Sequence, residues 1–263
     1  MPLTNPVILI TNDDGITAPG IRNLTESLKG LGRLVVVAPD SPQSGMGHAI
    51  TIGTPLRLRQ SDIFQDLGVE AWQCNGTPVD CVKIARGIVL GFKPDICVSG
   101  VNHGSNASIN VIYSGTMSAA MEAAIEGIPA AGFSLMDFRP DADFTVSRIV
   151  ARTTVRRMLA EHMPEHLLLN INIPKVGKKE FKGIRVCRQA NATWKEHFEE
   201  RLDPRGQRYY WMTGKFINND MGEDTDVSAL NSGYASIVPV TIDFTEAAHR
   251  KWLEGKLNAK APS

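Results

Sequence analysis

Three short polar segments of the chain carry side chains that could do chemistry. The first holds two adjacent carboxylates, Asp13 and Asp14, directly before Gly15, while the second contains Ser44 and the third Asn102. Two close carboxylates repel each other, and one pKa rises unless a cation neutralises them. Carboxylate, hydroxyl and amide oxygens favour Mg²⁺, Mn²⁺ or Ca²⁺ over structural zinc. We therefore predict a divalent-cation site whose ligands are Asp13, Asp14, Ser44 and Asn102.

The two carboxylates can serve one site only if the backbone turns beside them. Successive side chains on a regular strand point to opposite faces, and Gly15 permits such a turn. A plainer interpretation stays open at this point, in which Asp13 and Asp14 cap the following helix and bind only water.

A second group of residues has the character of a phosphate site. Ser114, Gly115 and Thr116 stand at the start of a predicted helix, where hydroxyls and free backbone N–H groups can cradle an anion. The alternative is an ordinary Ser/Thr helix cap. The polar loops add three more predicted substrate contacts: Asn12, Gly45 and Asn106.

Two histidines, His48 and His103, lie in the same polar loops. Either could protonate a leaving alkoxide or bind a phosphate oxygen. The alternative for each is a loop histidine that bonds the backbone. We take His48 as the first candidate for a general acid, so the predicted catalytic residues are Asp13, Asp14 and His48.

The elements that must position these residues alternate between strands and helices. Short β-branched runs predict strands, and apolar residues at helical spacing predict helices between them. Buried strands in βαβα order indicate an α/β fold with an open, mostly parallel sheet and helices on both faces. Ligands in such sheets bind beyond the carboxyl ends of the strands, so the three loops should converge there. The predicted strands are Val7–Thr11, Leu34–Ala38, Asp95–Ser99, Ala130–Ser134 and Leu167–Ile173, and the helices are Pro19–Leu31, Pro78–Leu90, Gly115–Glu126 and Phe144–Glu161; Ala49–Leu58 and Val69–Cys74 are a hairpin or two extended pieces.

After about residue 180 the pattern changes. Ile184–Gln189, Tyr209–Met212 and Ala235–Val240 are predicted as strands joined by polar loops, followed by a helix from Thr245 to about Leu257. The predicted organisation is a core of residues 1–180, a β-rich arm of residues 181–241 with a strand that returns to the core, and a C-terminal helix within 242–263.

The composition of the chain excludes several classes of protein. Its 263 residues carry 28 Lys+Arg and 28 Asp+Glu, so the zero net charge gives no overall attraction to nucleic acid or an anionic membrane. No apolar run approaches the ~20 residues of a membrane span, and the N-terminus does not resemble a signal peptide. The four cysteines form no C-x-x-C pair, which favours reduced thiols in a cytoplasmic protein.

Several well-known motifs are absent. The chain has no G-K-[ST], H-E-x-x-H or G-x-S-x-G, and Asp13-Asp14-Gly15 does not fit a calcium-binding EF-hand loop. The glycines at 45 and 47 lack the third glycine of a dinucleotide fingerprint. ATP-driven, serine-hydrolase and nicotinamide chemistry are therefore disfavoured.

Taken together, the polar segments closely resemble the SurE family, the stationary-phase survival proteins. The matching segments preserve the order and spacing of the family over nearly the whole chain. They are Ile10–Ile16, Val37–Asp40 with Ser44-Gly45, Gly76–Val82, Val98–Gly104, Tyr113–Thr116, Asp203–Gly206 and Gly233–Ile237.

The resemblance implies a Rossmann-like domain with a swapped C-terminal arm, assembled as a homodimer or homotetramer. It implies metal-dependent hydrolysis of nucleoside 5′- and 3′-monophosphates, and in some members of short polyphosphate. The family's ligands for one divalent ion per subunit, Mg²⁺ or Mn²⁺, carry over onto Asp13, Asp14, Ser44 and Asn102; His48 is a less secure match. We therefore expect a 5′-nucleotidase. The alternatives are a nucleotide-binding regulatory module that hydrolyses nothing, and a metal-dependent glycosyl- or acyl-transfer enzyme, for which we find neither an acceptor site nor a base.

Overall fold

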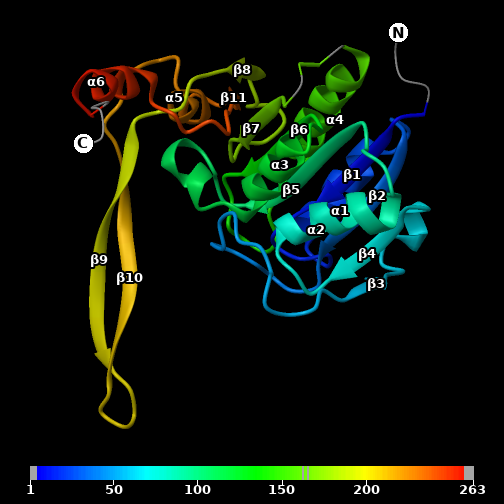
Figure 1. Ribbon diagram of the computed structural model, residues 1–263, viewed down its shortest axis with the longest axis horizontal. Helices are drawn as coiled ribbons and strands as arrows, with labels where there is room; N and C mark the ends of the chain where they lie inside the picture. The colour runs from blue at the N-terminus through cyan, green and yellow to red at the C-terminus, as the bar shows by residue number, and fades with distance from the viewer. Residues whose placement is uncertain (1–4, 162, 165, 258–263) are drawn as a thin grey trace, which may run out of the picture.

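The structure is a computed structural model that describes residues 5–161, 163–164 and 166–257. Its centre is a nine-stranded sheet with the order β3-β4-β2-β1-β5-β6-β7-β11-β8 (Figure 1). All neighbouring strands are parallel except the β3–β4 and β7–β11 pairs. The strands are β1 (Val7–Thr11), β2 (Arg33–Pro39), β3 (Leu58–Gln60), β4 (Glu70–Cys74), β5 (Ile96–His103), β6 (Ala130–Leu135), β7 (Leu168–Ile173), β8 (Ile184–Val186) and β11 (Ala235–Pro239).

Helices cover both faces of this sheet, so its central strands are apolar on both sides. On β1, Ile8 and Ile10 pack into the core under α1 (Pro19–Leu28) and α4 (Thr145–Ala160). Leu9 packs into the opposite core, under α2 (Pro78–Ile84) and α3 (Gly115–Ile125). The predicted α/β fold class is confirmed.

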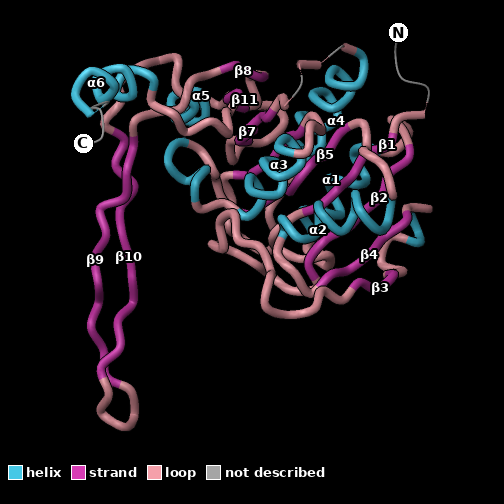
Figure 2. The backbone as a smooth tube through the Cα atoms, in the orientation of Figure 1, coloured by secondary structure: helices cyan, strands magenta, loops and turns pink. Residues whose placement is uncertain are grey.

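The C-terminal part of the chain adds a long two-stranded hairpin. Strands β9 (Ala192–Leu202) and β10 (Arg208–Asn218) pair antiparallel along their whole length and project from the body of the molecule (Figure 2). The short helix α5 (Asp226–Asn231) and the terminal helix α6 (Ala247–Leu257) follow. Among the described residues, no helix is both long and apolar enough to cross a membrane.

Several predicted boundaries were wrong. Residues 49–57 form no strand, and the helix predicted to reach Leu90 becomes π-helical over Ala85–Leu90. Strand β5 runs past Ser99 to His103, so Asn102 lies in a strand and not in a loop. The strand predicted over Tyr209–Met212 extends over Arg208–Asn218, and its partner β9 was missed altogether. The Thr77 helix cap was correct, and Asp80 completes a capping box there.

Candidate functional site

The predicted site lies where the order of the parallel strands reverses. Strand β1 is flanked by β2 on one side and β5 on the other, and the chain returns across β1 between β4 and β5. The loops that leave the carboxyl ends of β1 and β5 therefore diverge and open a crevice, which is the usual ligand site of an open α/β sheet.

Asp13 is buried in this crevice, where the residue is only 4% exposed. Its Oδ1 accepts a hydrogen bond from the hydroxyl of Thr116 at the start of α3. A Cβ atom on Gly115 would lie 2.7 Å from the Cβ of Asp13 and 2.9 Å from its Oδ2. Position 115 must therefore be glycine for the N-terminus of α3 to pack this closely on the carboxylate.

Asp14 is partly buried and turns toward β5. Its Oδ2 accepts a hydrogen bond of 3.3 Å from the backbone N–H of His103. Burial raises the pKa of Asp14 above its ordinary value, while this hydrogen bond lowers it. Burial also raises the pKa of Asp13 to about 6, against the lowering effect of Thr116 and with a further rise from the nearby Asp14. Both carboxylates thus lie where a cation would relieve an unfavourable charge.

The loop after β2 is joined to the same residues. The backbone N–H of Gln43 donates to the carbonyl of Asp13 over 2.7 Å, and that of Ile16 donates to the carbonyl of Pro39 over 2.8 Å. Ser44 follows Gln43 directly and its side chain is exposed. The predicted ligand Ser44 therefore stands one residue beyond a fixed contact with Asp13.

Asn102 completes the predicted oxygen donors, and Asn12, a predicted substrate contact, is held in the same way. Asn102 donates its Nδ2 to the carbonyl of Gly104 over 2.8 Å, which leaves its Oδ1 as the acceptor for a ligand. Asn12 likewise donates its Nδ2 to the carbonyl of Gly15 over 2.8 Å. The Oδ1 of Asn12 is buried and has no hydrogen-bond partner in the described part of the chain.

These residues fit a hard divalent cation. Within residues 5–161, 163–164 and 166–257, no three or more His, Cys, Asp or Glu side chains gather as a metal cluster. The donors here are instead two carboxylates, a carboxamide and a hydroxyl, a set suited to Mg²⁺ or Mn²⁺ and unsuited to structural zinc.

Of the predicted phosphate contacts, Gly115 and Thr116 adjoin the carboxylate of Asp13. Ser114 caps α3, because its Oγ accepts the N–H of Met117 over 3.0 Å, so the capping interpretation of this residue holds. The hydroxyl of Thr116 is engaged by Asp13. Asn106 is buried, and its Nδ2 lies 2.8 Å from the hydroxyl of Ser134. Glycine 45 has a φ of 72° in the loop beyond Gln43, a backbone conformation that favours glycine.

The two histidines have different neighbours. His48 pairs through Nε2 with Glu122 of α3 over 2.9 Å, and Lys83 binds the second oxygen of the same carboxylate. His103 packs its ring edge-on against Phe144 at 5.3 Å, and its Nδ1 is buried without a partner among the described residues. His48 also borders an apolar groove of about 880 Å³ that lies between α3 and residues 238–244.

Sequence reasoning missed four side chains that touch the predicted site residues. Glu122 holds His48, while Ser134, Asn170 and Asn172 surround Asn106. A signal for the last two was present: two asparagines alternate with isoleucine inside an otherwise apolar strand. Glu122 gave no such signal, because it is a single charged residue in an Ala/Met-rich helix.

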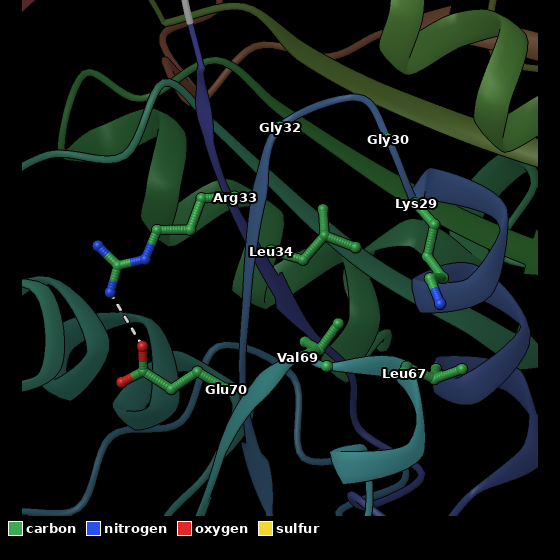
Figure 3. A pocket seen from close by; sticks show the side chains of 9 residues that line it. Lys29, Gly30, Gly32, Arg33, Leu34, Leu67, Val69 and Glu70 are labelled. Atoms are coloured by element: carbon green, nitrogen blue, oxygen red, sulfur yellow. Dashed lines mark hydrogen bonds and ion pairs between the residues drawn. The ribbon is translucent and has the colours of Figure 1, made fainter.

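A different hollow lies at the opposite ends of the strands. Lys29, Arg33 and Glu70 border a pocket of about 260 Å³, in which Arg33 pairs with Glu70 over 2.9 Å (Figure 3). Arg33 begins β2 and Glu70 begins β4, so this pocket lies at the amino ends of the strands. Ligands of open α/β sheets bind at the carboxyl ends.

The fold and the site define an α/β protein with two neighbouring carboxylates and a helix N-terminus at the switch point of a mostly parallel sheet. The family described as Survival protein SurE matches residues 8–196. A 5′-nucleotidase SurE from Christiangramia forsetii is 59% identical over 240 residues, covering 91% of this chain and 92% of that one. A 5′-nucleotidase SurE from Cytophaga hutchinsonii is 55% identical over 257 residues, covering 97% of each chain.

A solved structure agrees with these relatives. The crystal structure of the SurE protein from Aquifex aeolicus superposes with a TM-score of 0.82 at 39% identity, covering 95% of this chain and 99% of that one. The chain belongs to the SurE family.

The raised pKa of Asp13 predicts how the stability of the metal-free protein depends on pH. An unfolded Asp titrates near ~3.9, so folded protein holds the Asp13 proton more tightly, and stability falls as pH rises from about 4 to about 6. The loss is about 2–3 kcal/mol and is absent in Asp13→Asn. Urea denaturation in EDTA across this pH range measures it.

The exposed Asp62 supplies the matched control, because Asp62→Asn should keep the wild-type slope. Parallel pH curves for the wild type and Asp13→Asn would contradict the assignment of a desolvated carboxylate to Asp13.

Proposed function

We propose that this protein is a metal-dependent 5′-nucleotidase that hydrolyses nucleoside monophosphates to nucleoside and phosphate. The observation that carries the proposal is the buried, desolvated carboxylate of Asp13 beside Asp14, against which the N-terminus of α3 packs. The proposal is supported by relatives named 5′-nucleotidase SurE that are 59% and 55% identical to this chain. Activity at the 3′ position and on short polyphosphate is part of the same proposal.

Asp13, Asp14, Ser44 and Asn102 would hold one Mg²⁺ or Mn²⁺ ion per subunit. Such an ion polarises a phosphoryl oxygen and lowers the pKa of a bound water. The amide orientation of Asn102 is set by its bond to Gly104, so its Oδ1 faces away from that carbonyl.

The chain's own groups bind and orient the phosphate. Ser114 and the first turn of α3 place hydroxyl and N–H donors at the helix N-terminus, where the helix dipole favours an anion. Thr116 fixes one oxygen of Asp13 and leaves the other for the cation. The remaining proposed contacts are Asn12, Gly45, Asn106 and Gly115.

The first test is phosphate release from a panel of nucleoside monophosphates in EDTA, Mg²⁺ or Mn²⁺. Turnover should require the metal, and Asp14→Ala should lower kcat/KM at least about 100-fold, since a bound ion contributes several kcal/mol to the transition state. The exposed Asp62→Asn variant should match the wild type. Nucleotide binding without release anywhere in the panel would instead indicate a non-hydrolytic regulatory module.

His48 is proposed as the general acid that protonates the leaving alkoxide. The carboxylate of Glu122 lies 2.9 Å from Nε2 of His48 and orients the imidazole ring. His48→Gln should lower kcat for nucleoside monophosphates about 100-fold. Hydrolysis of p-nitrophenyl phosphate should stay near the wild-type rate, because a phenolate leaves without a proton. Equal losses on both substrates would remove His48 from this role.

We further propose assembly into a homodimer or homotetramer through the arm of residues 181–241, beyond the core of residues 1–180. Nearly every residue of β9 and β10 is exposed, including Phe198, Trp211 and Met212, and helix α6 buries no residue within the chain. Apolar surface of this extent on a projecting hairpin is typical of an interface.

A cytoplasmic location is supported by four buried, unpaired cysteines.

A shortened hairpin tests the assembly. Lys195 and Lys215 are cross-strand partners, so an Asn-Gly turn in place of residues 196–214 joins them with hairpin geometry. This variant should lose the largest assembled species in size-exclusion chromatography with light scattering. Gln207→Ala at the exposed tip is the control and should keep the wild-type mass. An unchanged mass in the shortened variant would exclude the hairpin as an interface.

A further inference from the structure

Strand β7 carries two polar side chains in an otherwise apolar, fully buried sequence. Asn170 is 2% exposed and Asn172 is 0% exposed. Ile171 and Ile173 pack into the core under α1 and α4, so the two asparagines point to the opposite face, on the α3 side. Burying a carboxamide is unfavourable unless its hydrogen bonds are made, so the partners of these two side chains show what they do.

Both asparagines bind the backbone of one residue, Asn106. Asn172 accepts the N–H of Asn106 at its Oδ1 over 2.7 Å, and Asn170 donates its Nδ2 to the carbonyl of Asn106 over 2.8 Å. Asn172 also donates to the Oδ1 of Asn170 over 3.0 Å, which fixes the orientation of each carboxamide relative to the other. The hydroxyl of Ser105 donates to the same Oδ1 of Asn172 over 3.1 Å.

The loop that contains Asn106 depends on these bonds. Gly104 donates its N–H to Leu135, but the N–H and C=O of Asn106 have no backbone partners among the described residues. Asn170 and Asn172 therefore replace the regular hydrogen bonds that a strand or helix would provide. Without Asn172, the N–H of Asn106 would be a buried donor with no acceptor, and the loop would rotate to satisfy it.

The same asparagine belongs to a polar row that crosses the sheet. Asn102 of β5 is in register with Ser134 of β6, which is in register with Asn172 of β7, followed by Ser236 of β11. The row therefore begins at a proposed cation ligand. Its middle member, Ser134, contacts the side chain of Asn106 over 2.8 Å.

The contact with Ser134 leaves the Asn106 carboxamide free to serve a phosphate. A serine hydroxyl both donates and accepts, so it satisfies either end of the carboxamide. Asn106 can thus turn its NH₂ group toward a phosphate oxygen and keep the Ser134 contact through its oxygen. The backbone of Asn106 must stay fixed if its NH₂ group is to keep pointing at the phosphate oxygen.

We propose that Asn172 is a positioning residue that fixes the backbone of Asn106 so that its side chain meets the substrate phosphate. The proposal rests on the nucleotidase function argued above. Asn172 acts through Asn106 and touches neither substrate nor metal.

The test compares Asn172→Ala with Ser236→Ala in the metal-loaded protein. Ser236 is the matched control, because it is buried, in register with Asn172, and its hydroxyl has no partner among the described residues. Asn172→Ala should lower kcat/KM for a nucleoside monophosphate about 10- to 100-fold and weaken the binding of inorganic phosphate similarly. Its affinity for Mn²⁺ should stay close to that of Ser236→Ala, which should behave as wild type, while the urea midpoint of Asn172→Ala should fall because buried hydrogen-bonding groups lose their partner.

Hydrogen exchange at the amide of Asn106 gives a readout that does not need turnover. Exchange should quicken in Asn172→Ala and stay slow in Ser236→Ala. Asn172→Asp should restore most of the phosphate affinity near pH 6, because a buried carboxyl stays protonated and then donates and accepts as asparagine does. No rescue by Asn172→Asp would contradict the proposal.

Two further outcomes would overturn it. Unchanged kcat/KM and phosphate affinity in Asn172→Ala would show that the loop needs no such support. A loss of Mn²⁺ binding in parallel with activity would show a general structural role. Failure of the nucleotidase function itself is distinguishable, since the wild type would then release no phosphate while the exchange difference at Asn106 persists.

Discussion

The site depends on one unfavourable feature, a carboxylate that folding removes from water. Asp13 is 4% exposed, and burial is the largest influence on its pKa. Its surroundings are arranged to hold it there: Thr116 donates to it, Gly115 leaves room for it, and Gln43 binds its backbone. These contacts bring together three elements that are far apart in the sequence. A cation at this point would return the electrostatic free energy that burial costs.

The same strands supply the core and the site, because their composition changes along their length. On the α3 side of the sheet, Leu9, Cys97 and Leu168 form the apolar core. Further toward the carboxyl ends, that face carries Ser134, Asn170 and Asn172, all buried. Apolar packing at one end thus anchors a polar network at the other. Such a network specifies a unique geometry when its members are satisfied, as Asn170 and Asn172 are.

The elements and caps that were predicted correctly depend on local sequence patterns. The features that were missed depend on contacts between residues far apart in the sequence. Strand β1 and the Thr77 cap were correct because a short β-branched apolar run and a capping residue are local signals. The pairing of His48 with Glu122 spans 74 residues and leaves no trace in either segment. Strand β9 was missed because its exposed, charged sequence lacks a buried face. The site residues themselves were predicted from their positions after strands, whereas their supporting side chains were not.

The loop that bears Asn106 also forms hydrogen bonds with the base of the arm. Two residues beyond Asn106, the N–H of Ser108 binds the buried carboxylate of Asp226 over 2.7 Å, and the same carboxylate accepts the N–H of Ala190 over 3.0 Å. The hydroxyl of Ser108 donates to the carbonyl of Ala190 over 2.8 Å at the base of the hairpin. One short loop is therefore held by the sheet at one end and by the arm at the other. A displacement of the hairpin base therefore acts on the segment next to Asn106, so this loop links the proposed assembly to the proposed phosphate contact.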